Sequence, residues 1–253
     1  MVVITAGFSE TGTEGARLER ELLENARWHR VRLIGPNCLG IMRPSIGPNA
    51  TFARGNALPG SLGLVSQSGV LCTAMLDWAG PNKIGFSSVI LMGGSRDVDF
   101  GEIIDYLVND PKTEHILLYI EGVRDARRFL SSLRAAARLK PVILMKVGRH
   151  PVGSRAAVSH TGAIVGADDV FDAAIHRAGA VRVTTIGQLV AAAQALSSHV
   201  RPRAGGDDRP CDERQSRHAA TEPGYGFYSI EQQRRSAGEA GDTGAQERLK
   251  QPI

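Results

Sequence analysis

The chain has 253 residues, of which 42% are hydrophobic and 5% aromatic, and its formal net charge is +4. This length allows one large or two small domains, and so small a charge argues against a nucleic-acid partner. Three cysteines without a CxxC pair indicate neither a disulfide framework nor a zinc site. No apolar run approaches the roughly 18 residues that span a bilayer, and no signal peptide opens the sequence, so we expect a cytoplasmic protein without a membrane partner.

The first elements in chain order form a single βαβ unit within residues 1–45. Buried strands are expected over 2–8 and 31–37, and apolar residues at helical spacing predict a helix over 15–30. One βαβ unit cannot cover both faces of a sheet. We therefore expect residues 1–45 to be only part of a larger α/β domain, and the proline and glycine residues of 46–60 predict a linker after it.

A more complete α/β pattern fills residues 61–199. Its strands are expected at 62–66, 87–92, 115–121, 141–147 and 181–183. Its helices are expected at about 69–79, 99–109, 124–138, 168–178 and 186–198. Short crossovers of this kind predict a flavodoxin-like, doubly wound parallel sheet, in which ligands bind beyond the C-terminal ends of the strands.

Residues 200–253 are different in character. They are polar and show no sustained apolar period, which predicts a disordered tail. Because the α/β pattern stops abruptly near residue 200, we expect a truncated or frameshifted reading frame.

The turn SQSG, between a predicted strand and its helix, is the first candidate site. Ser66 and Ser68 offer hydroxyl groups, and Gly69 allows a ligand to approach the backbone closely. The free N–H groups and the dipole of the following helix favour an anion at this position. The plainer alternative is that Ser68 only caps the helix.

Two titratable residues follow other predicted strands. His160 lies among Ser, Thr and Gly in a long loop, and imidazole is a nucleophile near neutral pH. Glu121 ends the strand at 115–121, where a carboxylate can orient an imidazole and raise its basicity. Taken alone, each residue has a bland alternative: a loop histidine without a role, and a capping or solvated glutamate.

Two further groups have stronger structural explanations. The turn GPNCLG contains an amide and a thiol, Asn37 and Cys38, but a structural turn explains it more simply. Asp97, Asp99 and Glu102 suggest a metal, yet carboxylates are favourable before a helix in any case. We predict no metal site.

Taken together and in this order, the segments GPNCLG, GLVSQSG, DVDFGEIIDYLVNDPKT, YIEG and SHTGAIVG resemble the α-type subunit of succinyl-CoA synthetase and the ADP-forming acetyl-CoA synthetases. The similarity extends from residue 2 to about 198, and it implies that residues 1–45 are the C-terminal part of a Rossmann-like CoA-binding domain. It implies a component of an NDP-forming acyl-CoA synthetase, an acid–thiol ligase. Such enzymes reversibly convert acyl-CoA, phosphate and ADP into carboxylic acid, CoA and ATP through a phosphohistidine.

The resemblance assigns roles to particular residues. It implies His160 as the phosphohistidine and Glu121 as its partner. Its phosphate-binding positions fall on Ser66, Ser68, Gly69 and Gly162, and its positions near CoA and phosphate fall on Asn37 and Cys38. The implied cofactors are CoA and ADP or ATP with Mg²⁺, and the implied partners are an acyl-CoA or carboxylic acid and an ATP-grasp domain or subunit, in an oligomer.

Departures from the family pattern leave two alternatives. GGSRDVD differs from the usual GN-x-x-DVD, and neither the first part of the CoA-binding domain nor an ATP-grasp domain is visible in the sequence. The chain could therefore be an inactive truncated fragment. It could also be the acyl-CoA-sensing region of a protein acyltransferase, although such regions usually lack the histidine.

Overall fold

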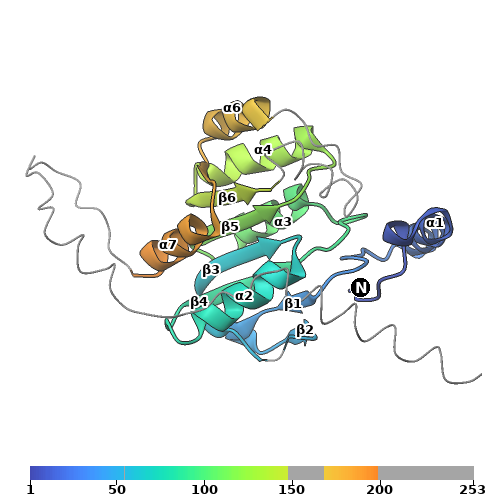
Figure 1. Ribbon diagram of the computed structural model, residues 1–253, viewed down its shortest axis with the longest axis horizontal. Coiled ribbons are helices and arrows are strands. Elements are labelled where there is room, and N and C mark those ends of the chain that lie inside the picture. Colours follow the sequence, from blue (N-terminus) through green and yellow to red (C-terminus); the bar gives the residue numbers. More distant parts are fainter. Residues whose placement is uncertain (54, 148–167, 199–253) are drawn as a thin grey trace, which may run out of the picture. The chain divides into compact units, whose positions relative to one another are not determined.

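The computed structural model describes residues 1–53, 55–147 and 168–198, and the account below concerns these residues (Figure 1). Near the N-terminus, the short helix η1 (Ser9–Thr11) precedes α1 (Thr13–Trp28), close to the predicted helix. The strands predicted on either side of α1 are reduced to a single parallel bridge between Val2 and Ile34. The prediction of a fully buried first strand is wrong, because only half-buried and exposed side chains occupy it.

A seven-stranded sheet forms the centre of the fold, in the order β2-β1-β4-β3-β5-β6-β7. The strands are β1 (Gly40–Met42), β2 (Asn49–Thr51), β3 (Leu58–Ser66), β4 (Gly85–Leu91), β5 (His115–Ile120), β6 (Val142–Lys146) and β7 (Val181–Val183). From β4 to β7 the strands are parallel, and their order is the 2-1-3-4-5 order of flavodoxin-like sheets. The predicted fold class is confirmed, and its topological switch point lies between β3 and β5.

The sheet also has an antiparallel extension that the sequence did not predict. β1 pairs antiparallel with β4, and β2 pairs antiparallel with β1. A short helix, η2 (Pro44–Ile46), precedes β2. Residues 46–60 were expected to be an irregular linker, but they contain β2 and the beginning of β3.

Helices cover both faces of the sheet. They are α2 (Gly69–Ala79), α3 (Phe100–Asn109), α4 (Ala126–Ala137), α6 (Asp168–Ala178) and α7 (Ile186–Ser197). One core joins the sheet to α3, α4 and α6, and the other joins it to α2 and α7. Leu64 and Val65 show why β3 reads as a continuous apolar run: successive side chains point to opposite faces, and each is fully buried in a different core.

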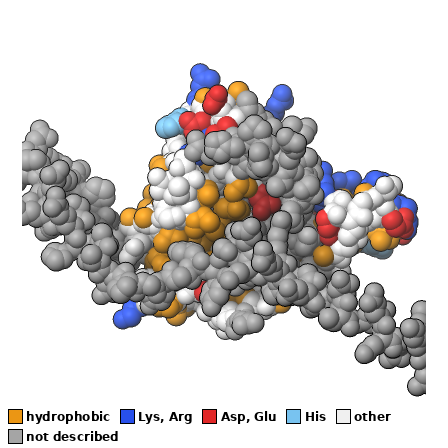
Figure 2. Space-filling model, viewed as in Figure 1, with side chains coloured by type: hydrophobic (Ala, Val, Ile, Leu, Met, Phe, Trp, Pro, Cys, Tyr) orange, Lys and Arg blue, Asp and Glu red, His pale blue; other side chains and the backbone are white. Residues whose placement is uncertain are grey.

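The face that carries α2 and α7 is not fully covered by described residues. Figure 2 shows hydrophobic side chains at the surface there, around the region of α7 and the neighbouring strands. Half-buried apolar residues pack against this core, among them Tyr119, Val147, Val183, Val190 and Leu196. Leu189 and Ala193 of α7 are fully buried and fix that helix to the sheet.

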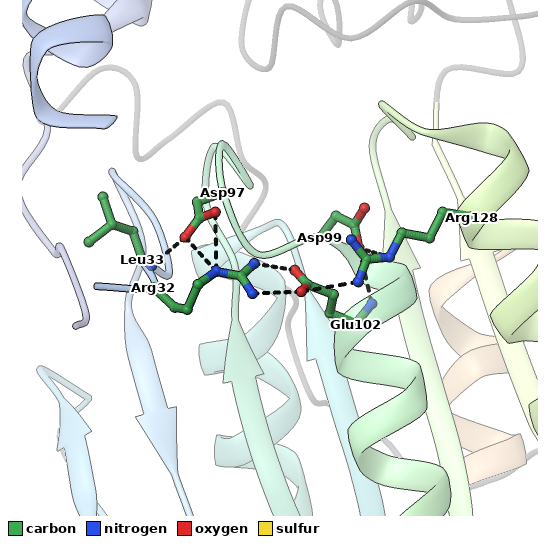
Figure 3. Close-up of polar contacts among 6 residues, drawn as sticks. All are labelled: Arg32, Leu33, Asp97, Asp99, Glu102 and Arg128. Carbon is green, nitrogen blue, oxygen red and sulfur yellow. Dashed lines mark hydrogen bonds and ion pairs between the residues drawn. The ribbon is translucent and has the colours of Figure 1, made fainter. Parts of the chain in front are cut away.

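An ionic cluster joins the N-terminal segment to the loop and helix that follow β4 (Figure 3). The Arg32 guanidinium donates to Asp97 at 3.0 Å and to Glu102 at 2.5 and 2.8 Å. Arg128 of α4 lies 3.0 Å from Glu102 on its other side. Hydrogen bonds from Arg32 lower the pKa of the Glu102 carboxyl; burial opposes this shift, and Arg128 adds to it.

We expect this cluster to make stability depend on pH. Because the pKa of Glu102 is lower in the folded chain than in the unfolded chain, its stabilising contribution is present above the unfolded value and is lost as the pH falls through the folded value. Urea unfolding of the Glu102→Gln variant should therefore show a shallower loss of stability than wild type, between about pH 5 and about pH 3. Glu24→Gln is the control, because the Glu24 side chain is exposed. Parallel curves for wild type and Glu102→Gln would contradict the assignment.

Candidate functional site

The turn SQSG lies where β3 ends at the switch point. Ser66 is fully buried, and its Oγ accepts from the Ser68 N–H at 3.0 Å while donating to the Ser68 carbonyl at 2.9 Å. The Ser66 hydroxyl therefore shapes the turn. Ser68 is the N-cap of α2, with its Oγ accepting from the Leu71 N–H at 3.4 Å, as the plainer interpretation of the sequence expected.

The first N–H groups of α2 remain available for a ligand. Within the described part of the chain, neither Gly69 nor Val70 has a hydrogen-bond acceptor for its backbone N–H. A Cβ added at Gly69 would meet nothing within 4 Å, so the space in front of the turn is open. Unpaired N–H groups at the positive end of a helix dipole favour an anion such as phosphate.

Glu121 follows β5, the neighbour of β3 across the switch point. Its side chain is half-buried. Burial and, to a lesser degree, the Glu121 carboxylate raise the pKa of Tyr119 to about 12, so this phenol keeps its proton at neutral pH. Because Ser66 pairs with Tyr119 at the ends of β3 and β5, Glu121 lies at the same edge of the sheet as the phosphate-binding candidates.

The side chain of Gln67 connects these two strand ends, and the sequence had not singled it out. Its Oε1 accepts from the N–H of Glu121 at 2.7 Å and from the N–H of Gly122 at 3.0 Å. The only available signal was its place in the middle of the SQSG turn. Its partners are 54 and 55 residues away, and nothing local predicts such a contact.

The GPNCLG turn reaches the same edge through the loop after β4. Pro36 accepts from the Gly94 N–H at 2.9 Å. Gly93, at φ 55°, lies so close to the turn that an added Cβ would be 2.2 Å from the carbonyl oxygen of Asn37. This close approach explains the glycine at position 93, and the Asn37 side chain of the turn is exposed.

Cys38 is not prepared for nucleophilic chemistry. The thiol is buried and donates to the Val3 carbonyl at 3.3 Å. Burial raises the pKa of the Cys38 thiol, which disfavours the thiolate. Cys38 therefore acts as a buried packing residue of the GPNCLG turn.

The two remaining predicted residues, His160 and Gly162, lie outside the described residues. The described residues are interrupted after Val147, one residue beyond β6, and Val147 donates its N–H to the Ile120 carbonyl at 3.0 Å. Val147, the last described residue before the segment that contains both residues, therefore lies next to the residue that precedes Glu121.

The carboxylates considered as metal ligands lie in ion pairs. Asp97 and Glu102 pair with Arg32, and Asp99 caps α3 by accepting from the Glu102 N–H at 3.0 Å. In the described ranges, no three His, Cys, Asp or Glu residues are grouped closely enough to hold a metal ion.

Comparison with known proteins identifies the family. Residues 59–196 match the model of the succinyl-CoA ligase-like flavodoxin domain. The chain belongs to this family. The match covers β3 from its second residue, all of β4 to β7, and the turns that carry Ser66, Gln67 and Glu121.

Several of the relatives with curated names are ADP-forming acetate–CoA ligases. The α subunit of ADP-forming acetate–CoA ligase I from Pyrococcus furiosus is 40% identical over 201 residues, which are 79% of this chain and 44% of that protein. ADP-forming acetate–CoA ligase I from Archaeoglobus fulgidus is 43% identical over 188 residues, 74% of this chain and 27% of that protein. The chain thus spans less than half of either relative.

A solved structure of the family agrees with the fold. The dinucleotide-forming acetyl-coenzyme A synthetase 1 from Ca. Korarchaeum cryptofilum, in complex with phosphate and ADP, superposes with a TM-score of 0.75 and 34% identity. The superposition covers 80% of this chain and 44% of that one.

Among the described helices, none combines the length and the apolar character needed to cross a membrane.

Proposed function

We propose that the chain is the phosphohistidine-carrying component of an ADP-forming acyl-CoA synthetase. One observation supports this most directly: at adjacent strand ends of the switch point stand Glu121 and a turn whose first helical N–H groups have no acceptor among the described residues. The family relationship to ADP-forming acetate–CoA ligases supports the same conclusion.

The proposed reaction begins with a thioester and phosphate. An oxygen of the phosphate attacks the thioester carbonyl, the C–S bond breaks, and CoA leaves as a thiol with the proton of the phosphate. The backbone N–H groups of Gly69 and Val70 hold the phosphate through its oxygens, and Ser66 and Ser68 keep the turn in shape for this. Gly162 is proposed to complete the cradle, and Asn37 to lie near the thiol end of CoA.

Phosphoryl transfer to the chain is the second step. The lone pair of one His160 ring nitrogen attacks phosphorus, and the carboxylic acid leaves as a carboxylate with the electrons of the broken P–O bond. Glu121 accepts the proton of the other ring nitrogen and so favours the attack. This chemistry needs chiefly positioning and charge stabilisation, which the strand ends provide.

The remaining components are proposed for a partner. The described residues offer phosphate a place but group no ligands for Mg²⁺, so we assign ADP, ATP and Mg²⁺ to an ATP-grasp domain or subunit. With such a partner, the proposed active form is an oligomer or a larger assembly. We propose the cytoplasm as its location, because its CoA substrates are there.

Labelling tests the proposal directly. The full chain, mixed with a separately produced ATP-grasp subunit, Mg²⁺ and γ-labelled ATP, should acquire a phosphoryl group that is labile in acid and stable in base. The chain alone with labelled acetyl phosphate should acquire the same group by the second step. Absence of label in both mixtures, or a label that survives acid, would contradict the proposed function.

A further inference from the structure

We propose that Gln67 is a positioning residue that holds Glu121 in register with the phosphate-binding turn. The inference rests on the proposed function and adds to it a residue that links the two halves of the site. Its basis is the hydrogen bonding at the switch point. There the Gln67 side chain, and no longer the backbone of β3, accepts from the backbone N–H groups that follow β5.

Regular pairing between β3 and β5 ends one residue before this contact. The last paired residues are Ser66 and Tyr119, and the backbone N–H of Gln67 still donates to the Tyr119 carbonyl at 3.2 Å. Beyond that point the two chains diverge, because one enters α2 and the other enters the loop toward α4. In open α/β sheets this divergence creates the crevice in which ligands bind.

Gln67 bridges the diverging chains. Its Oε1 accepts from two consecutive N–H groups, those of Glu121 at 2.7 Å and of Gly122 at 3.0 Å. Gly122 is buried, so water cannot readily replace the amide oxygen as a partner. The backbone on both sides of the Glu121 carboxylate is thereby tied to the turn that precedes Gly69.

The chemistry of the contact sets the requirement at position 67. Two N–H donors need an acceptor, so the atom facing them must be the amide oxygen and not the amide nitrogen. A glutamate at position 67 has the same length and keeps an acceptor. A leucine fills similar space but leaves both N–H groups without a partner.

We call the two hydrogen bonds that Gln67 accepts from the Glu121 and Gly122 amides the Gln67 clamp. The first test measures this clamp without reference to catalysis. Amide hydrogen exchange on the full chain should show that Gln67→Leu lowers the protection of the Glu121 and Gly122 amides by about 10-fold or more. Gln67→Glu should keep that protection. The amides of β3 and β5 should remain protected in both variants, which shows that the fold is intact. Unchanged exchange at both amides in Gln67→Leu would overturn the inference.

Gln188 provides a matched control. Its Oε1 also accepts from two consecutive N–H groups, those of Thr184 at 2.8 Å and Thr185 at 3.3 Å, but within the local capping box at the start of α7. Gln188→Leu therefore removes an equivalent contact at edge strand β7 instead of at the switch point. Its effect on Glu121 and Gly122 exchange should be absent.

The second test measures positioning. Gln67→Leu should lower the maximal rate of labelling by acetyl phosphate by about 10-fold, while the half-saturating acetyl phosphate concentration stays within about twofold of wild type. Gln188→Leu should label at the wild-type rate. A normal maximal rate in Gln67→Leu would refute the positioning role. If wild type itself fails to label, the proposed function fails, and the exchange experiment still decides whether the clamp exists.

Discussion

We expect the His160→Asn variant to acquire no acid-labile phosphoryl group under conditions that label the wild-type chain fully. Asparagine keeps a polar side chain of related size, but its amide nitrogen has no lone pair available to attack phosphorus. The acid-labile label should therefore fall to background in both labelling mixtures, since both reactions transfer the phosphoryl group to the same ring nitrogen of His160. Scintillation counting after base and after acid treatment measures it.

A second histidine supplies the control for this experiment. His176 is exposed on α6, with 76% of its side chain accessible, and lies 4.0 Å from Asp172 in a surface pair. His176→Asn should label as wild type does. Persistence of the acid-labile label in His160→Asn would show that another residue is the phosphoryl acceptor, even if the complete synthetase reaction still takes place.

Replacing Glu121 with glutamine should slow labelling on the order of 10²-fold. The substitution preserves the shape of the side chain and the two backbone N–H groups that Gln67 holds, but it removes the charge that accepts the proton of the imidazole. Single-turnover labelling at several acetyl phosphate concentrations measures the rate. The label should remain acid-labile, because the acceptor is unchanged.

The opposite end of the same strand offers the control for Glu121. Glu114 is exposed just before β5, and its contact to the sheet is through its backbone N–H, which donates to the Ser61 carbonyl at 2.9 Å. Glu114→Gln should leave the labelling rate unchanged. An unchanged rate in Glu121→Gln would remove that carboxylate from the reaction.

The sequence predicted the elements after residue 61 closely because their signals are local. β5 was expected at 115–121 and spans His115–Ile120, an apolar run buried on both faces. α2 was expected at 69–79 and spans Gly69–Ala79, since Ser68 marks its start. The first strand was predicted incorrectly because a buried strand needs partners, and the local sequence reports only its apolar character.

The sequence could also predict part of the candidate site, because predicted strands imply which loops meet at one edge of the sheet. Ser68, Gly69 and Glu121 follow strands, and parallel strands bring their C-terminal ends to one edge, so their neighbourhood follows from topology. The internal use of the Ser66 hydroxyl depends on the exact turn geometry. The contact of Gln67 with Glu121 depends on a distant segment, and a single sequence carries no record of it.

The antiparallel strands β1 and β2 have a consequence for where the folding unit begins. The family match starts at residue 59, but β4 pairs on its outer side with β1, which lies before that boundary. A chain cut at the boundary would expose the N–H and C=O groups along β4, in which every residue after Gly85 is buried, and an exposed strand edge of this kind pairs readily with further chains. A shortened chain must therefore begin no later than Gly40 to keep the outer edge of β4 paired, and we expect a chain that begins at residue 59 to self-associate.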